Sequence, residues 1–266
     1  MSKQVITPDL RRWIVEQAQS GCLPEDILAS MRASGWDEEV ALQALEQTLR
    51  EHLITQGGAS GGGLPPAVPV PEPHLEDSPN TLWAGDRQVQ VLLSVRLPRI
   101  VVFGNFMSDE ECDALIADAT PRLSRSETVV NATGGSEVND ARTSHGMFFG
   151  QGETALCERI EQRIAALVNW PVEHGEGIQV LRYAPGAEYR PHQDYFDPAQ
   201  PGMATVLARG GQRVGTLVMY LNTPAKGGAT TFPDIGLEVA PVKGQAVFFS
   251  YSRAHVVSRT LHGGSP

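Results

Sequence analysis

Between residues 177 and 252, glycines and prolines divide the chain into short apolar segments, and this pattern constrains the fold more than any other feature. The segments are GIQVLRY, EYRPHQDYF, RVGTLVMYLN, ATTFP, LEVAP and QAVFFSYS. Short strands that are separated by such residues favour an antiparallel architecture. We therefore expect a barrel or a double-sheet jelly roll.

The region before these segments predicts additional strands and two helices. Residues 88–96 and 100–104 are rich in Val, Leu and Ile and are expected to form strands, as is the segment 141–149. Ser108 is expected to cap a helix whose first turn is acidic, and residues 153–170 have the pattern of an amphipathic helix. Such helices would pack on one outer face of the strands, which predicts a mainly β domain with flanking helices, of the α+β class.

The segment 124–140 is polar and contains Gly134 and Gly135. We expect it to form a mobile loop.

The first 55 residues are expected to form a separate module of three short helices. Thr7 and Pro8 begin the first helix, Pro24 begins the second, and Asp37 is expected to cap the third. Residues 56–80 are Gly-rich and then Pro-rich, which is typical of a flexible and then extended linker. The predicted domains are therefore 1–55, the linker 56–80, and 81–266.

The stretch MRASGWDEEVALQAL, residues 31–45, resembles ubiquitin-associated domains. These domains carry a methionine and a glycine-aromatic turn before an Ala- and Leu-rich third helix. The resemblance implies docking of a peptide or partner protein. A generic three-helix bundle, with Met31 and Trp36 in its core, is the alternative reading of the same residues.

Charge and cysteine usage narrow the functional classes. The net charge of −10 argues against a nucleic acid or an anionic membrane as partner. The three cysteines, Cys22, Cys112 and Cys157, are widely spaced, which argues against a disulfide framework or a cysteine zinc site. Because no apolar run resembles a signal peptide or a membrane span, we expect a cytoplasmic protein. These features leave the oligomeric state open.

His192 and Asp194 are candidate metal ligands. Residues two apart on a strand point to the same face, so both side chains would project together from EYRPHQDYF. Glu188 and Arg190 share this parity, so the spacing alone does not single out the pair. A third ligand would come from the segment that contains His255 and His262, and the spacing favours neither of these two.

Four segments in one order resemble the prolyl 4-hydroxylase branch of the iron(II)- and 2-oxoglutarate-dependent dioxygenases. They are QVLRYAPGAEYRPHQDYF at 179–196, RVGTLVMYLNTPAKGGATTFP at 213–233, VAPVKGQAVFFSY at 239–251 and TLHGGSP at 260–266. The resemblance extends over most of residues 95–266. It implies that the metal ligands are His192, Asp194 and His262, because family members carry the distal histidine in a His-x-x-x-Pro context.

The resemblance also implies the reaction. Two histidines and one carboxylate form a facial triad that leaves coordination positions open on Fe(II). Family members use 2-oxoglutarate and O2, release succinate and CO2, and hydroxylate a protein or peptide, with proline the favoured target; ascorbate keeps the iron reduced. On this basis we expect Tyr183 and Thr230 to bind the co-substrate, and Arg142 and Thr143 to line the substrate groove.

The chain departs from the family pattern after the distal histidine. Relatives carry a basic residue, usually lysine, which pairs with the far carboxylate of 2-oxoglutarate, whereas this chain ends at Pro266. The expectation is a dioxygenase domain that is truncated at its C-terminus. The alternative is a non-catalytic scaffold that recruits a partner through its helical module and Pro-rich linker.

Overall fold

The computed structural model describes residues 4, 6–19, 22, 24–56, 64–126, 128–129, 135–137 and 142–266. The chain divides into two compact units, Met1–Pro66 and Ala67–Pro266. In the expected mobile loop at 124–140, the described residues include three two-residue strands, β4 (Ser124–Arg125), β5 (Thr128–Val129) and β6 (Ser136–Glu137), and most of the others lie outside the described residues.

The described part of the first unit contains the helices α1 (Pro8–Gln19), α2 (Pro24–Ala33) and α3 (Glu38–Gln56). As expected from the sequence, Asp37 caps α3, because its Oδ1 accepts hydrogen bonds from the backbone N–H groups of Glu39 (3.0 Å) and Val40 (3.3 Å). All three helices contribute to one small apolar core, which consists of Ile14, Ile27, Met31, Ala41, Ala44 and Leu45.

Two antiparallel sheets form the centre of the second unit. The strands of the larger sheet, in spatial order, are β1 (Thr81–Ala84), β2 (Arg87–Val95), β3 (Arg99–Gly104), β13 (Ala246–Ser250) and β10 (Gly215–Met219). Those of the smaller sheet are β12 (Leu237–Val239), β11 (Thr230–Phe232), β14 (His262–Gly264) and β9 (Tyr189–His192). Further described elements are β4 (Ser124–Arg125), β5 (Thr128–Val129), β6 (Ser136–Glu137), β7 (His145–Phe148), β8 (Gln179–Arg182) and α6 (Met203–Gly210).

Strand β3, at the centre of the larger sheet, is buried on both faces. Ile100 and Val102 belong to a core cluster that also contains Phe232 of β11 and Val239 of β12, so this face packs against the smaller sheet. The alternate residues of β3 belong to a second cluster that contains helical residues. A continuous apolar run is what such a doubly covered strand requires. The smaller sheet is thereby held against a rigid support.

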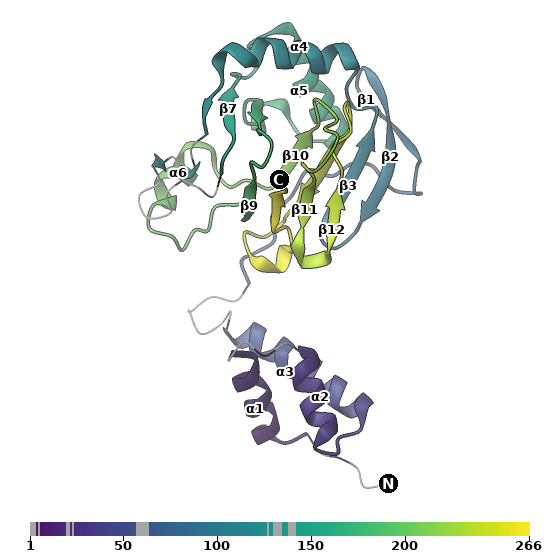
Figure 1. Ribbon diagram of the computed structural model, residues 1–266, viewed down its shortest axis with the longest axis vertical. Helices are drawn as coiled ribbons and strands as arrows, with labels where there is room; N and C mark the ends of the chain where they lie inside the picture. Colours follow the sequence, from purple (N-terminus) through teal and green to yellow (C-terminus); the bar gives the residue numbers. More distant parts are fainter. Residues whose placement is uncertain are drawn as a thin grey trace. The chain divides into compact units, whose positions relative to one another are not determined.

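The helices α4 (Asp109–Ala119) and α5 (Ala155–Val168) cover the other face of the larger sheet (Figure 1). Ser108 caps α4 in a capping box with Glu111, and Thr154 caps α5. The flanking helices therefore form where the sequence predicts them. Among the described residues, no helix has both the length and the apolar character needed to cross a lipid bilayer.

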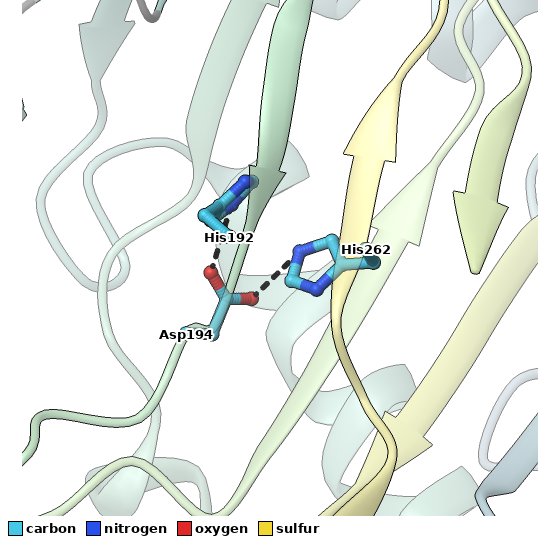
Figure 2. A group of neighbouring side chains, drawn as sticks. All are labelled: His192, Asp194 and His262. Atoms are coloured by element: carbon cyan, nitrogen blue, oxygen red, sulfur yellow. Dashed lines mark ion pairs between the residues drawn. The ribbon is translucent and has the colours of Figure 1, made fainter. Parts of the chain in front are cut away.

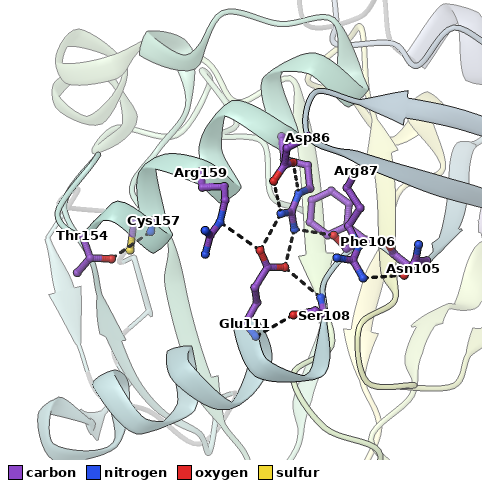
Figure 3. Close-up of polar contacts among 10 residues, drawn as sticks. Asp86, Arg87, Asn105, Phe106, Ser108, Glu111, Thr154, Cys157 and Arg159 are labelled. Atoms are coloured by element: carbon purple, nitrogen blue, oxygen red, sulfur yellow. Dashed lines mark hydrogen bonds and ion pairs between the residues drawn. The ribbon is translucent and has the colours of Figure 1, made fainter.

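A buried arginine joins α5 to α4 and to the turn after β1. Arg163 of α5 donates two hydrogen bonds of 2.8 Å to Asp86 and two of 2.8 and 2.7 Å to Glu111. It also donates to the carbonyl oxygen of Phe106 at 2.9 Å. Figure 3 shows Glu111 at the centre of this cluster, between Ser108 and Arg159. The network fixes the helix layer relative to the edge of the larger sheet.

The Pro-rich part of the expected linker packs against the second unit. The N–H of Val68 donates to the carbonyl of Ser252 at 2.9 Å, and Pro71 is buried. A Cβ on Gly215 would lie 2.8 Å from Cγ of Pro71, so the two backbones approach closely at β10. Glu72 forms an ion pair with Arg99 of β3. Extended proline-containing chain has little conformational freedom to lose, which favours such docking over a free spacer.

We predict that Gly177→Ala destabilises the second unit by about 1–3 kcal/mol, because overpacking displaces backbone. A Cβ at this position would lie 2.1 Å from the carbonyl oxygen of Phe149, whose N–H is bonded to Ile178. Gly210→Ala is the matched control, since nothing lies within 4 Å of its Cβ position and it ends α6. Urea unfolding compares the two variants, and equal stability of both would contradict this account.

Candidate metal centre

The pairing of β9 with β14 places two histidines opposite each other. In the antiparallel register, His262 of β14 is the direct partner of His192 of β9. Their ring centroids are 4.4 Å apart. Gly263 allows the two strands to approach, because a Cβ there would lie 2.8 Å from the carbonyl oxygen of Tyr189. Residues 70 positions apart in the chain thus reach one site through a single strand pairing.

Asp194 completes the group, although it lies outside the strand. The expected strand over 188–196 is wrong in extent, since β9 ends at His192 and the chain then bends away. Even so, Oδ1 of Asp194 lies 3.4 Å from Nε2 of His192, and Oδ2 lies 3.4 Å from Nε2 of His262 (Figure 2). One ligand atom from each residue lies within 4.8 Å of the others, and this is the separation expected of groups that share one cation.

Hydrogen bonds orient both imidazole rings. Nδ1 of His192 lies 2.9 Å from the carbonyl oxygen of Arg190, and Nδ1 of His262 lies 2.9 Å from that of Thr260. A carbonyl only accepts, so each Nδ1 carries the proton and each Nε2 presents its lone pair. Each Nε2 lies 3.4 Å from one carboxylate oxygen of Asp194. This arrangement, in which the ring nitrogen remote from the metal donates to a carbonyl, is typical of metal-binding histidines.

The electrostatics keep the carboxylate of Asp194 ionised. Burial alone would raise its pKa, but hydrogen bonding to His192, the charge that His262 carries when protonated and the Thr216 hydroxyl lower the pKa well below its usual range. Burial lowers the pKa of His262. Metal ligation requires a deprotonated carboxylate and a neutral imidazole, and the two shifts favour these forms at Asp194 and His262. Two nitrogens and one carboxylate suit Fe(II) in a facial triad.

The sequence left His255 and His262 as alternatives for the third ligand, and only His262 joins the group. His255 instead precedes a short 3₁₀ turn, where its Nδ1 accepts a hydrogen bond from the N–H of Val257 at 3.2 Å. It is a capping residue and does not reach β9.

The two residues expected at the co-substrate have different environments. Thr230 lies on β11, beside β14, and is 8% exposed; its hydroxyl accepts a hydrogen bond of 2.8 Å from the hydroxyl of Tyr220. Tyr220 is buried as well, and burial raises its pKa to about 12, so the phenol is protonated. Tyr183 follows β8 and is 37% exposed. A buried hydroxyl pair thus lies next to the strand that carries His262.

The two residues expected at the substrate groove both contact the strand of the first histidine. The guanidinium of Arg142 lies 4.9 Å from the ring centroid of Tyr189, and that ring stacks on His192 with centroids 3.6 Å apart. The hydroxyl of Thr143 bonds to the backbone of Glu188 in both directions, at 3.1 and 2.8 Å. The ring of Tyr189 therefore lies between Arg142 and the candidate ligand His192. Thr143 fixes the backbone of Glu188, directly before β9.

Sequence analysis missed four residues that contact this site. Tyr189 stacks on His192, and Tyr220 bonds to Thr230. Thr216 donates a hydrogen bond of 2.7 Å to Oδ2 of Asp194, and the hydroxyl of Tyr251 lies 3.2 Å from that of Thr216. The sequence could have indicated only Thr216. It lies two positions before Val218, so its side chain points to the same face of the strand, and this face packs against the smaller sheet.

The comparisons with known proteins agree with this chemistry. Residues 178–266 match the model of the 2OG-Fe(II) oxygenase superfamily. Prolyl 4-hydroxylase 1 of Arabidopsis thaliana is 40% identical over 207 residues, which cover 68% of this chain and 71% of the relative. Prolyl 4-hydroxylase 5 of the same plant is 39% identical over 204 residues, with 68% and 67% covered.

Solved structures of two prolyl hydroxylases also match. The viral collagen prolyl hydroxylase of Paramecium Bursaria Chlorella virus-1, in its 2OG complex, aligns with a TM-score of 0.47 and 29% identity over 63% of this chain and 87% of that chain. A Pseudomonas putida prolyl-4-hydroxylase aligns with a TM-score of 0.43 and 20% identity over 63% and 84%. From the sequence relatives and the superfamily match, this chain belongs to the prolyl 4-hydroxylase family of Fe(II)- and 2-oxoglutarate-dependent dioxygenases.

Proposed function

We propose that this protein hydroxylates prolyl side chains in a protein or peptide, consumes 2-oxoglutarate and O2, and releases succinate and CO2. The observation that carries the proposal is the convergence of His192, Asp194 and His262 on one point between β9 and β14. Relatives named prolyl 4-hydroxylases, at 40 and 39% identity, support the choice of proline.

Three side chains provide the proposed iron ligands. We assign the iron to Nε2 of His192, Nε2 of His262 and the carboxylate of Asp194. When bound, Fe(II) supplies the oxidative chemistry with 2-oxoglutarate and O2. The protein contributes two oriented imidazoles and a carboxylate that stays ionised. We infer that ascorbate maintains the reduced metal.

The co-substrate and the substrate would occupy opposite sides of the histidine pair. The buried hydroxyl of Thr230, next to β14, accepts from the phenol of Tyr220 and can itself donate to a carboxylate. We place 2-oxoglutarate there, with Tyr183 at the exposed end. Arg142, over Tyr189, provides a cation near the other histidine. We assign Arg142 and Thr143 to the border of the peptide groove.

We also propose assignments for the fold of the second unit, for the helical unit and for the location of the protein. We propose that the two facing sheets form a double-stranded jelly roll, supported by their shared core and antiparallel pairing. We propose that the helical unit is a ubiquitin-associated-like module, supported by buried Met31 in its core, and that it recruits a partner. The three widely spaced cysteines support a reducing, cytoplasmic location.

A coupled assay tests the proposed reaction. The protein is incubated with Fe(II), ascorbate, 2-oxoglutarate and a proline-rich peptide, and succinate is measured together with the mass of the peptide. We expect succinate formation that depends on Fe(II), together with one added oxygen atom on proline. A matched peptide with alanine in place of proline controls for uncoupled turnover. Equal oxidation of both peptides, or succinate formation that does not need iron, would contradict the proposal.

A further inference from the structure

The carboxylate of Asp194 has two unequal oxygens. Within the described part of the chain, His192 is the polar contact of Oδ1, whereas Oδ2 contacts His262 and also accepts a hydrogen bond of 2.7 Å from the Thr216 hydroxyl. A charge-assisted bond of this length is stronger than a neutral one. Thr216 lies on β10 of the larger sheet, so a rigid strand from outside the ligand-bearing sheet holds one oxygen.

The direction of the hydrogen bonds follows from the charges. An ionised carboxylate only accepts, so the Thr216 hydroxyl must donate to it and can in turn accept from the phenol of Tyr251, at 3.2 Å. Burial and the neighbouring Asp194 charge raise the pKa of Tyr251, so its phenol keeps the proton that it donates. The result is a series of two hydrogen bonds, from Tyr251 to Thr216 and from Thr216 to Oδ2 of Asp194.

Burial, a backbone hydrogen bond and ring packing hold Tyr251, the first donor, in place. Tyr251 is 2% exposed, and its N–H donates at 3.0 Å to the carbonyl of Val214, the residue directly before the strand that carries Thr216. Its ring packs edge-on against Tyr195, with centroids 5.8 Å apart. Buried aromatic rings in such packing keep one rotamer, so the phenol is held in place.

We propose that Thr216 and Tyr251 are positioning residues that hold Oδ2 of Asp194, so that Oδ1 is the oxygen left for the metal. This inference rests on the proposed iron site. Without these two hydrogen bonds, the carboxylate could rotate and place either oxygen, or both, towards the cation. The affinity for the metal and the defined geometry of the site would then be lost. Hydrogen bonds to ligating carboxylates typically change metal affinity by about 10–100-fold.

The test is a titration of the full chain with Mn(II), followed by the electron paramagnetic resonance signal of the free ion. We expect Thr216→Val to raise the Mn(II) Kd by about 10–100-fold, and Tyr251→Phe by about 2–10-fold because it acts through Thr216. Thr216→Ser keeps the hydroxyl and is expected to restore the affinity to within about threefold of the unmodified protein. Tyr195→Phe is the matched control and should leave the Kd unchanged.

Three results would overturn the positioning role. They are unchanged affinity in Thr216→Val, equal losses in Thr216→Ser and Thr216→Val, or equal effects of Tyr251→Phe and Tyr195→Phe. If Thr216→Val does not fold, Thr216→Ser and the two tyrosine variants still decide the question. A failure of the underlying iron site is distinguishable, because the unmodified protein would then bind no Mn(II) at all.

Discussion

Replacement of His262 by alanine is expected to reduce Fe(II)-dependent succinate formation by more than about 100-fold, above the range that changes to outer-shell partners produce. The imidazole is 6% exposed, is oriented by Thr260, and directs its Nε2 towards Asp194 at 3.4 Å. Its loss leaves one histidine and one carboxylate, which cannot hold Fe(II) in a facial triad. Succinate is measured at saturating 2-oxoglutarate and peptide.

His255→Ala is the matched control, because it removes the same side chain from a neighbouring part of the sequence. This histidine caps a short turn through its bond to Val257 and does not belong to the metal group. We expect it to retain activity within about threefold, since loss of an exposed cap costs about 1 kcal/mol of stability and no ligand. Comparable losses in both variants would mean that the wrong histidine has been assigned.

Replacement of Arg163 by methionine is expected to destabilise the catalytic unit by about 3–5 kcal/mol, because removal of one partner of a buried ion pair leaves the other uncompensated. The side chain of Arg163 is 1% exposed and that of Glu111 11%. Five hydrogen bonds of the guanidinium, to Asp86, Glu111 and Phe106, are lost together. Hydrogen exchange of the α5 amides reports the stability of this unit directly.

Arg159→Met is the control for the loss of a positive charge from the same helix. Arg159 is 52% exposed and contacts Glu111 at 3.3 Å, so its loss is expected to cost less than about 1 kcal/mol. If hydrogen exchange in α5 is equally fast in both variants, Arg163 does not stabilise this unit more than Arg159 does, and the account would be contradicted.

The same network predicts how stability depends on pH. The hydrogen bond to Arg163 lowers the pKa of Glu111 despite its burial, and a further bond to Ser108 lowers it more. A carboxyl whose folded pKa is depressed contributes stability above its unfolded value, near 4.5, and loses that contribution as the pH falls through the folded value. We therefore expect a loss of stability below about pH 4.5 in the unmodified protein. Urea unfolding at a series of pH values should show a smaller loss in Glu111→Gln, which keeps the contribution of Asp86.

Local patterns predicted most of the elements from the sequence. The capping box at Ser108 and the apolar run of β3 depend on neighbouring residues, and both elements form where expected. The extent of β9 was wrong, because strand parity cannot show that the chain bends after His192. The choice between His255 and His262 depended on family resemblance, since only the pairing of β14 with β9 distinguishes them in physical terms.

Contacts between distant segments were beyond the reach of sequence patterns. Thr216 and Asp194 are joined by one hydrogen bond across two sheets, and nothing in the local sequence of either residue marks the other. The docking of Pro71 on Gly215 is similar, because composition alone indicated an extended spacer. In each case the decisive interaction comes from the packing of complete elements, which periodicity does not encode.

The most direct test of the metal centre is a crystal structure of the protein soaked with Mn(II) and 2-oxoglutarate, with anomalous scattering used to locate the ion. We predict one strong anomalous peak within coordination distance of Nε2 of His192, Nε2 of His262 and the carboxylate of Asp194. A peak that lies elsewhere, on His255 for example, or the absence of any peak between β9 and β14, would contradict the account.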